Sequence, residues 1–210
     1  IADLAVRSGE PVVAVAEYGQ LFTSTDLVNW TREETGTSRW LRSATYFGNT
    51  PTNTARLLVA SGQSGTLLVS EDFTSFRTID LNTADWLEGI TASDTRIVAV
   101  GDNAAIYTSD DGTNWVRPAN NFNGVWLRGV TWRSNGVFVT VGEGGLIATS
   151  SNGINWTRQN SRTTANLNRV VATPTGFVAV GEGGAVVVDS SGNGTTWRNA
   201  SSGATGPINL

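Results

Sequence analysis

Short runs of apolar and polar residues alternate along the whole chain, and glycine-rich segments separate them. The runs are rich in β-branched and aromatic residues, while Gly, Asn, Ser and Thr fill the segments between them. Such runs suit strands of a few residues, and the segments between them suit tight turns. The pattern predicts an all-β fold with almost no helix.

One unit recurs five times, and each copy ends on an aromatic residue about every 42 residues, the length of a propeller blade. The copies cover residues 11–30, 56–76, 96–115, 136–156 and 176–197. Their last residues are Trp30, Phe76, Trp115, Trp156 and Trp197. We expect these aromatics to pack in the core between neighbouring units.

A further strand precedes each copy, which gives four strands per unit. These strands are WLRSATY (40–46), WLEGITA (86–92), WLRGVTW (126–132) and LNRVVAT (167–173), with IADLAVR (1–7) in the first unit. In each unit this segment is strand A, the VAV-type run is B, the LFTS-type run is C, and D carries the aromatic residue. A sheet this small cannot bury both faces alone, so neighbouring sheets must pack on one another.

The sequence therefore predicts a single five-bladed β-propeller over residues 1–210, with four-stranded antiparallel blades of about 42 residues. The repeats are about 1–34, 35–80, 81–120, 121–161 and 162–210. Residues 208–210 fall where a further strand A would begin, so we expect the termini to meet in a closed ring of five. A fragment of a larger propeller would give the same repeats. The second unit carries an insertion, FGNTPTNTA (47–55), which reads as a polar loop in its A–B turn.

The D strands carry a short motif that resembles a known family. Thr108, Asp110, Gly112 and Trp115 follow the pattern Ser/Thr, any, Asp, any, Gly, any, any, Trp, and the other copies keep less of it. The chain resembles the Asp-box/BNR (sialidase-type) and Ycf48-like β-propeller repeat family. The resemblance implies a propeller fold, and an interaction-scaffold role for the Ycf48-like members. It says little about catalysis, because Asp-box turns shape hairpins away from the ligand face.

Composition removes most enzyme classes. Cysteine and histidine are both absent, so disulfides, thiol catalysis and histidine-based catalysis or metal binding are excluded. We expect no cofactor and no metal. Any chemistry would run on carboxylates, hydroxyls or arginine.

Charge and hydropathy narrow the partners further. All 14 basic residues are arginine, and the net charge is −4, which does not favour binding to nucleic acid. No apolar run approaches the roughly 20 residues that cross a bilayer. We expect a soluble monomer, extracellular or periplasmic, with a carbohydrate or a protein as its ligand.

Charged residues cluster where strand A begins and strand B ends. In an antiparallel A–B hairpin these two positions lie side by side. The register pairs Asp3 with Glu17, Arg42 with about Gln63, Glu88 with Asp102, Arg128 with Glu143, and Arg169 with Glu182. The D–A connections and the B–C turns meet at this end of each sheet, so we take it as the candidate ligand face.

The pairs differ in chemistry. Arg128 with Glu143 and Arg169 with Glu182 are simple ion pairs, which can tie strand ends together. The carboxylate pairs repel unless a cation, a proton or a nearby arginine compensates. Three interpretations of the carboxylate pairs therefore remain open: a ring of salt bridges, a cation site, or a site that binds sugar hydroxyls.

Three tryptophans stand at the start of strand A, namely Trp40, Trp86 and Trp126. Flat aromatic rings can stack on sugars. The fourth copy has Leu167 and the first has Ile1 in what we take as the same position, so a buried apolar position is the competing interpretation.

Three functions remain open. The first is a non-catalytic, lectin-like module, with Trp40, Arg42, Trp86, Trp126, Arg128, Glu143, Arg169 and Glu182 at its ligand face. The second is a glycoside hydrolase or sialidase-like enzyme that uses Asp3, Glu17, Glu88 or Asp102 as acid and base. The third is a protein-interaction scaffold.

Overall fold

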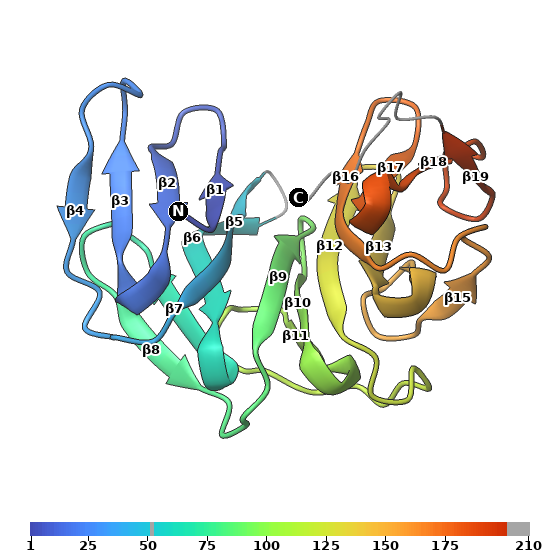
Figure 1. Ribbon diagram of the computed structural model, residues 1–210. Coiled ribbons are helices and arrows are strands. Elements are labelled where there is room, and N and C mark those ends of the chain that lie inside the picture. Colours follow the sequence, from blue (N-terminus) through green and yellow to red (C-terminus); the bar gives the residue numbers. More distant parts are fainter. Residues whose placement is uncertain (51–52, 201–210) are drawn as a thin grey trace. The chain divides into compact units, whose positions relative to one another are not determined.

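The computed structural model describes residues 1–50 and 53–200. Within these ranges the chain forms five antiparallel sheets, and its only helical pieces are five three-residue 3-10 turns (Figure 1). This confirms an all-β chain with almost no helix. The chain divides into two compact units, Ile1–Ala99 with Tyr107–Val116, and Val100–Ile106 with the chain from Arg117 onward.

Unit 1 contains two four-stranded meanders. The first is β1 (Asp3–Ala5), β2 (Val12–Val15), β3 (Leu21–Ser24) and β4 (Thr31–Glu33). The second is β5 (Leu41–Thr50), β6 (Asn53–Gly62), β7 (Thr66–Ser70) and β8 (Arg77–Asp80). Each strand pairs with the next one along the chain, which is the expected order of strands A to D.

The first two sheets pack face to face. Val13, Val15 and Leu21 from the first sheet join Leu58 and Leu68 from the second in one buried cluster. Successive residues are buried along β2, from Val13 to Val15, and all along β7, so both faces of these strands are covered. Burial between neighbouring sheets thus provides the core of unit 1.

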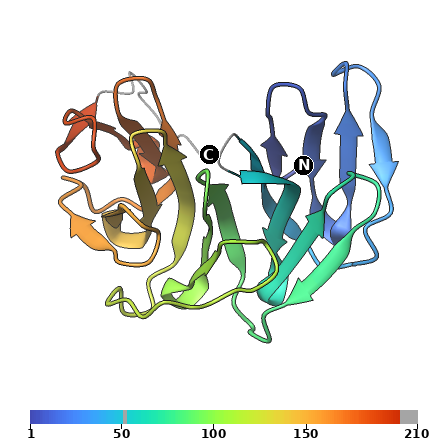
Figure 2. The same cartoon turned by 180° about the vertical axis from the view of Figure 1, so that it is seen from behind.

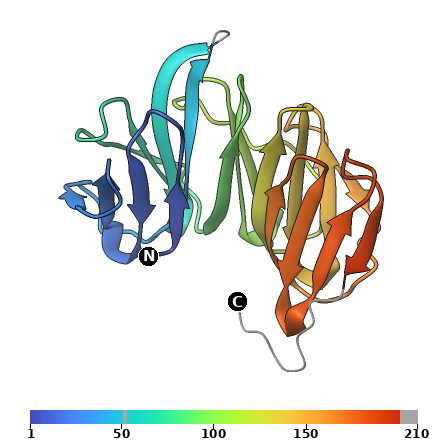
Figure 3. The ribbon, with the colours of Figure 1, turned by 90° about the horizontal axis from the view of Figure 1, so that it is seen from above.

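The insertion of the second repeat lengthens a hairpin. Strands β5 and β6 are each ten residues long and stay paired from Leu41↔Gly62 to Thr50↔Asn53, with two register shifts. The hairpin projects beyond the other strands of unit 1 (Figure 3). The expected polar loop over 47–55 is therefore wrong for the paired residues, while residues 51–52 lie outside the described chain.

The third sheet has three strands, β9 (Leu87–Ala92), β10 (Ile97–Gly101) and β11 (Ile106–Ser109). Its expected fourth strand is reduced to one bridge between Thr108 and Val116. Two residues beyond that bridge stands Pro118, which has no N–H to continue the ladder. The chain instead runs as a loop to β12, in yellow-green in Figure 2.

Unit 2 contains two further four-stranded meanders. The fourth sheet is β12 (Leu127–Arg133), β13 (Val137–Gly142), β14 (Ile147–Ser150) and β15 (Thr157–Gln159). The fifth is β16 (Leu167–Ala172), β17 (Phe177–Gly181), β18 (Val186–Asp189) and β19 (Trp197–Ala200). Val139 and Ile147 of the fourth sheet pack with Leu167 and Phe177 of the fifth, as the sheets of unit 1 do.

The five repeated aromatics differ in burial. Trp197 is 3% exposed and Phe76 packs against the unit 1 core, whereas Trp30 is 41% exposed. Trp115 and Trp156 are half-buried. A uniform core role for this position is therefore wrong at Trp30.

The sequence predicted the number of sheets and the strand order, and it missed the lost strand of the third sheet. Residues 208–210, where a further strand A was expected, lie outside the described chain. Within the described residues, no helix is long and apolar enough to cross a membrane.

Candidate functional site

Each B–C connection is a tight 3-10 turn of the same build. The turns are η1 (Glu17–Gly19), η2 (Gln63–Gly65), η3 (Asp102–Ala104), η4 (Glu143–Gly145) and η5 (Glu182–Gly184). Their middle residues, Tyr18, Ser64, Asn103, Gly144 and Gly183, all have φ between 52° and 64°. This is the left-handed region, which glycine and asparagine tolerate best.

In the first four turns the last residue lies against the D–A connection that follows. A Cβ on Gly19 would stand 1.9 Å from the Thr37 carbonyl oxygen, and one on Gly145 would stand 2.0 Å from that of Thr163. The B–C turns and the starts of the A strands therefore share one end of their sheets, as the sequence predicted. Ala104 is the exception, since it carries a Cβ at this position with φ 55°.

Three aromatic residues form a row at this end of unit 1, which we call the aromatic row: Tyr18, Trp40 and Trp86. The Tyr18 and Trp40 rings meet edge to face with centroids 5.6 Å apart. The Trp40 and Trp86 rings meet in the same way at 5.8 Å. Tyr18 is 64% exposed, and both tryptophans are half-buried. The row thus offers apolar ring surface to a ligand.

An ion pair lies beside the aromatic row. Arg42 donates through Nε and Nη2 to Glu88 Oε2, both at 2.9 Å, and its guanidinium lies 5.9 Å from the Trp86 ring centroid. The register shifts between Leu41 and Ser43, so Arg42 is the extra residue of a β-bulge. A bulge re-aims the side chain that it carries.

The structure corrects two partners in unit 1. Asp3 lies opposite Val15 and not Glu17, and its carboxylate accepts hydrogen bonds from Ser43 Oγ at 2.6 Å and the Ala44 N–H. Gln63 lies beside Trp40 and not Arg42, since its side chain accepts from the Trp40 N–H at 3.2 Å. For Gln63 the reason is again the bulge at Arg42, which shifts the start of strand A by one residue.

A second group of charges lies in unit 2 around Arg128. Its guanidinium reaches Glu143 at 3.6 Å and Glu182 at 3.5 Å, and it lies 5.8 Å from the centroid of the Trp126 ring. Trp126 is 45% exposed. The predicted pair of Arg128 with Glu143 is confirmed.

The predicted pair of Arg169 with Glu182 is wrong. Arg169 lies opposite Val180 and donates to the carbonyls of Arg128 and Asn168 at 3.1 and 3.2 Å. Asn166 donates to Glu182 instead, at 2.9 Å. A bulge between Leu167 and Arg169 places Asn168 in the position of Arg128.

This bulge also corrects the fourth copy of the tryptophan position. Leu167 lies opposite Gly181 as Leu127 lies opposite Gly142, so Asn166 and not Leu167 takes the place of Trp126. Sequence reasoning missed Asn166, Asn168 and the ring contact of Tyr18. An alignment that starts on the shared leucine of strand A would have found both asparagines.

The four proposed acids and bases do not form a common centre in the described contacts. Asp3 is held by Ser43 and Ala44, and Glu88 by Arg42. Glu17 is exposed in η1. Asp102 begins η3 in unit 2, so its pairing with Glu88 stays a prediction.

The C–D turns use different residues from the Asp-box pattern read in the sequence. Asp111 Oδ1 accepts from the N–H groups of Thr113 and Asn114, each at 2.7 Å, and Ser109 Oγ accepts from Gly112 at 2.8 Å. Asp110 points instead to Arg96, at 2.7 Å. The same hydrogen bonds recur at Asp26, Asp72 and Asn152. The working motif is thus Ser, any, Asp/Asn.

These turns explain the strongest shifts in acidity. Hydrogen bonds from the backbone of Asn114 and Thr113 hold the pKa of Asp111 well below its usual value. The backbone of Asn29 does the same to the pKa of Asp26, and that of Ser75 to the pKa of Asp72. Their shifted pKa values therefore reflect turn closure and do not mark a catalytic site.

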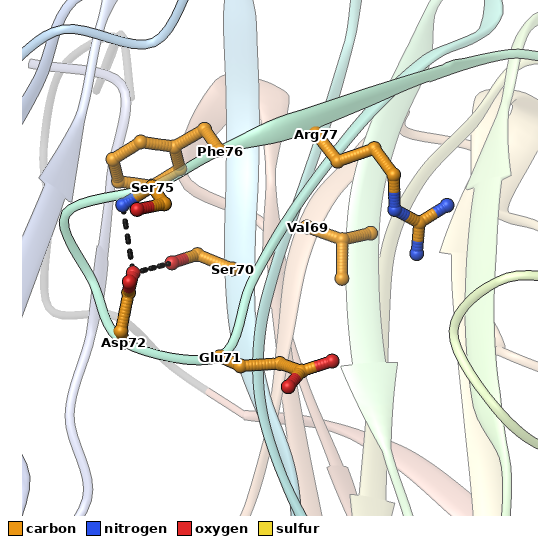
Figure 4. A pocket seen from close by; sticks show the side chains of 7 residues that line it. All are labelled: Val69, Ser70, Glu71, Asp72, Ser75, Phe76 and Arg77. Atoms are coloured by element: carbon orange, nitrogen blue, oxygen red, sulfur yellow. Dashed lines mark hydrogen bonds between the residues drawn. The ribbon is translucent and has the colours of Figure 1, made fainter.

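A shallow pocket of ≈ 290 Å³ lies at the second of these turns (Figure 4). Its lining includes Ser70, Asp72 and Ser75, and Asp72 accepts hydrogen bonds from both serines. The turn follows the end of β7, whereas η2 precedes its start. The pocket therefore lies at the opposite end of the strand from the aromatic row, and its polar groups already serve the turn.

Comparison with known proteins finds similar folds among solved structures. No family model matches the chain, and no curated protein matches its sequence. The solved structure of Ycf48 bound to D1 peptide is 18% identical with a TM-score of 0.67, over 94% of this chain and 65% of that one. The chain thus spans slightly less than two thirds of that Ycf48 chain.

Two other solved structures agree. The WD40 β-propeller domain of Doa1 is 16% identical with a TM-score of 0.66, over 95% of this chain and 67% of that one. The nidogen/laminin complex gives 16% identity and a TM-score of 0.68, over 90% and 74%. At these identities the likeness concerns the fold alone, and it supports a β-propeller type of repeat protein.

Proposed function

We propose that this chain is a non-catalytic protein-interaction module, and that its five sheets are the blades of one closed propeller. Meander sheets that pack face to face within each unit support the blade assignment. Leu4 on β1 is 54% exposed, Val6 just after β1 is 71% exposed, and Val171 on β16 is 56% exposed. Closure would bury such apolar side chains, which is the usual use of a blade face.

The observation that carries the proposal is the aromatic row. Exposed aromatic clusters are enriched at protein interfaces because each ring supplies much contact area with few rotatable bonds. The neighbouring Arg42 and Glu88 already pair at 2.9 Å. The site therefore offers ring surface and hydrogen-bond donors, while Arg42 neutralises the carboxylate of Glu88.

The comparisons support the same class of function. Ycf48 was solved with a D1 peptide, and the nidogen structure with laminin. Both structures are named as complexes with a peptide or a protein. We transfer to this chain only the class of ligand.

A peptide library tests the proposal. The full chain, immobilised through its N-terminus, should retain a subset of peptides, and Trp40→Ala combined with Trp86→Ala should abolish that retention. Trp30→Ala is the matched control, because Trp30 is an exposed tryptophan of unit 1 outside the aromatic row. A library from which the chain retains nothing, or equal retention by the double variant, would contradict the proposal.

Carbohydrate binding is the second candidate, and the environment of Trp126 favours it. The exposed Trp126 ring has Arg128 and Glu143 beside it, and Arg169 and Glu182 lie in the same unit. A flat ring bordered by donors and acceptors suits a sugar. On a glycan array, Trp126→Ala should then lose all signals of the parent chain, while Trp40→Ala keeps them. This function would fit the expected extracellular or periplasmic location.

A further inference from the structure

Tyr18 stands in a backbone conformation that other repeats give to smaller residues. Its φ is 57° and its ψ is 33°, and the equivalent residues are Ser64, Asn103, Gly144 and Gly183. A bulky side chain is unusual in the left-handed region and costs conformational free energy. Strain kept at one copy of a repeated turn indicates a use for that side chain.

The ring of Tyr18 extends the row formed by the two tryptophans. Its edge contact with Trp40 adds a third ring at nearly the same spacing, 5.6 Å after 5.8 Å. In the described part of the chain, neither the Tyr18 hydroxyl nor the Trp40 indole N–H has a hydrogen-bond partner. The row therefore presents three regularly spaced rings with two donors.

We propose that the aromatic row binds a proline-rich segment in the polyproline II conformation. This inference rests on the proposed function and names its partner class. Every second residue of such a helix is about 6 Å further along its axis, given the 3.1 Å rise per residue, which is close to the ring spacing. Proline-rich segments dock on surfaces lined by aromatic side chains in known recognition modes of this kind.

Hydrogen bonding and charge favour the same occupant. A proline segment carries carbonyl acceptors and lacks backbone N–H groups, so it matches a row that offers donors. A β-strand peptide would bring N–H groups that need acceptors, and the Glu88 carboxylate beside the row already accepts from Arg42. Arg42 and Glu88 offset each other's charge beside Trp86, so that end of the row suits an uncharged segment.

Titration of the full chain with decaproline tests the proposal, with a serine–glycine decapeptide as the reference ligand. Calorimetry and tryptophan fluorescence should both show saturable binding of decaproline and none of the reference. Trp40→Ala should weaken the binding at least about tenfold, as expected for a central aromatic anchor.

Tyr18→Gly separates binding from folding. Glycine is the residue of the equivalent turns at 144 and 183, so this variant should melt no lower than the parent chain, yet bind decaproline at least about fivefold more weakly. Ser64→Gly makes the same change in η2 of the same unit and should leave the affinity unchanged.

The outcomes distinguish the two proposals. If the chain retains other peptides through Trp40 and Trp86 but not decaproline, the partner class is wrong and the interaction module stands. If no peptide binds, both are wrong. Equal affinity of the Tyr18→Gly and parent chains for decaproline would remove Tyr18 from the site and contradict the argument from strain.

Discussion

Asp111 and Asn152 occupy the same position in two C–D turns, and each accepts hydrogen bonds from the backbone N–H groups two and three residues further on. The carbonyl oxygen of an asparagine therefore closes this turn as a carboxylate does. The difference between the two residues is charge alone, which makes the position a natural test of the pH dependence of stability.

The three aspartate turns should make the fold sensitive to acid. Their pKa values are lower in the folded chain than in the unfolded chain, so the unfolded state takes up protons first as the pH falls. Their stabilisation is fully present above about pH 4 and is lost progressively below it. Replacing Asp26, Asp72 and Asp111 together by Asn should flatten the loss of melting temperature between pH 4 and pH 2.5.

Thermal melts followed by circular dichroism measure this effect. A Glu34→Gln variant, which alters an exposed carboxylate outside the turns, should keep the acid sensitivity of the parent chain. An equally steep loss in the triple variant would show that other carboxylates control acid unfolding.

Exchange of alanine and glycine should affect stability much less at Ala104 than at Gly145. Ala104→Gly relieves a left-handed alanine but loses a buried methyl group, so stability should change by less than about 1 kcal/mol. Gly145→Ala places a Cβ 2.0 Å from the Thr163 carbonyl oxygen and should cost about 3 kcal/mol. Urea unfolding of both variants gives the comparison, and similar losses would contradict it.

Tyr46 should ionise at a higher pH than an ordinary tyrosine. Burial raises its pKa to about 12, with the nearby Glu10 carboxylate as a further cause. Stability linked to this group is complete below pH 10 and is lost as the pH rises through about 12, because the unfolded tyrosine gives up its proton first. Alkaline titration at 295 nm should lose this late step in Tyr46→Phe, and a step that persists would assign it to another tyrosine.

Trp197 and Trp30 should differ strongly in their contribution to stability, although they hold the same place in the repeat. Trp197 is 3% exposed, and its indole N–H donates to the Gly194 carbonyl at 2.7 Å. Its replacement by Ala should cost about 3–5 kcal/mol. Trp30 is 41% exposed, so its replacement should cost about 1 kcal/mol. Chemical denaturation of both variants measures the free energy of unfolding. Equal losses of stability would contradict the expectation from burial.

The sequence repeat predicted the sheets correctly because the order of the strands depends only on the local pattern of apolar runs and turn residues. It could not predict the bulges at Arg42, Arg128 and Asn168, since one extra residue in a strand leaves no mark in composition. Those bulges decide which residues meet, and they explain why Arg128 reaches Glu143 while Arg169 does not reach Glu182.

The C–D turn shows a second limit of the same kind. Around residue 110 the sequence fits the turn motif in two ways, with Thr108 and Asp110 or with Ser109 and Asp111. The two placements differ by one position. Only the hydrogen bonds select the second. The sequence pattern likewise could not single out Tyr18, because the features that distinguish it are its positive φ angle and its ring contact with Trp40.

The Ser, any, Asp/Asn turn also bears on how the chain acquires its structure. In the third repeat all of its hydrogen bonds join residues within the short span from Ser109 to Trp115. Closing so short a loop takes little chain entropy and little time. We therefore expect the four turns that carry the motif to form early, before their neighbouring sheets are in place.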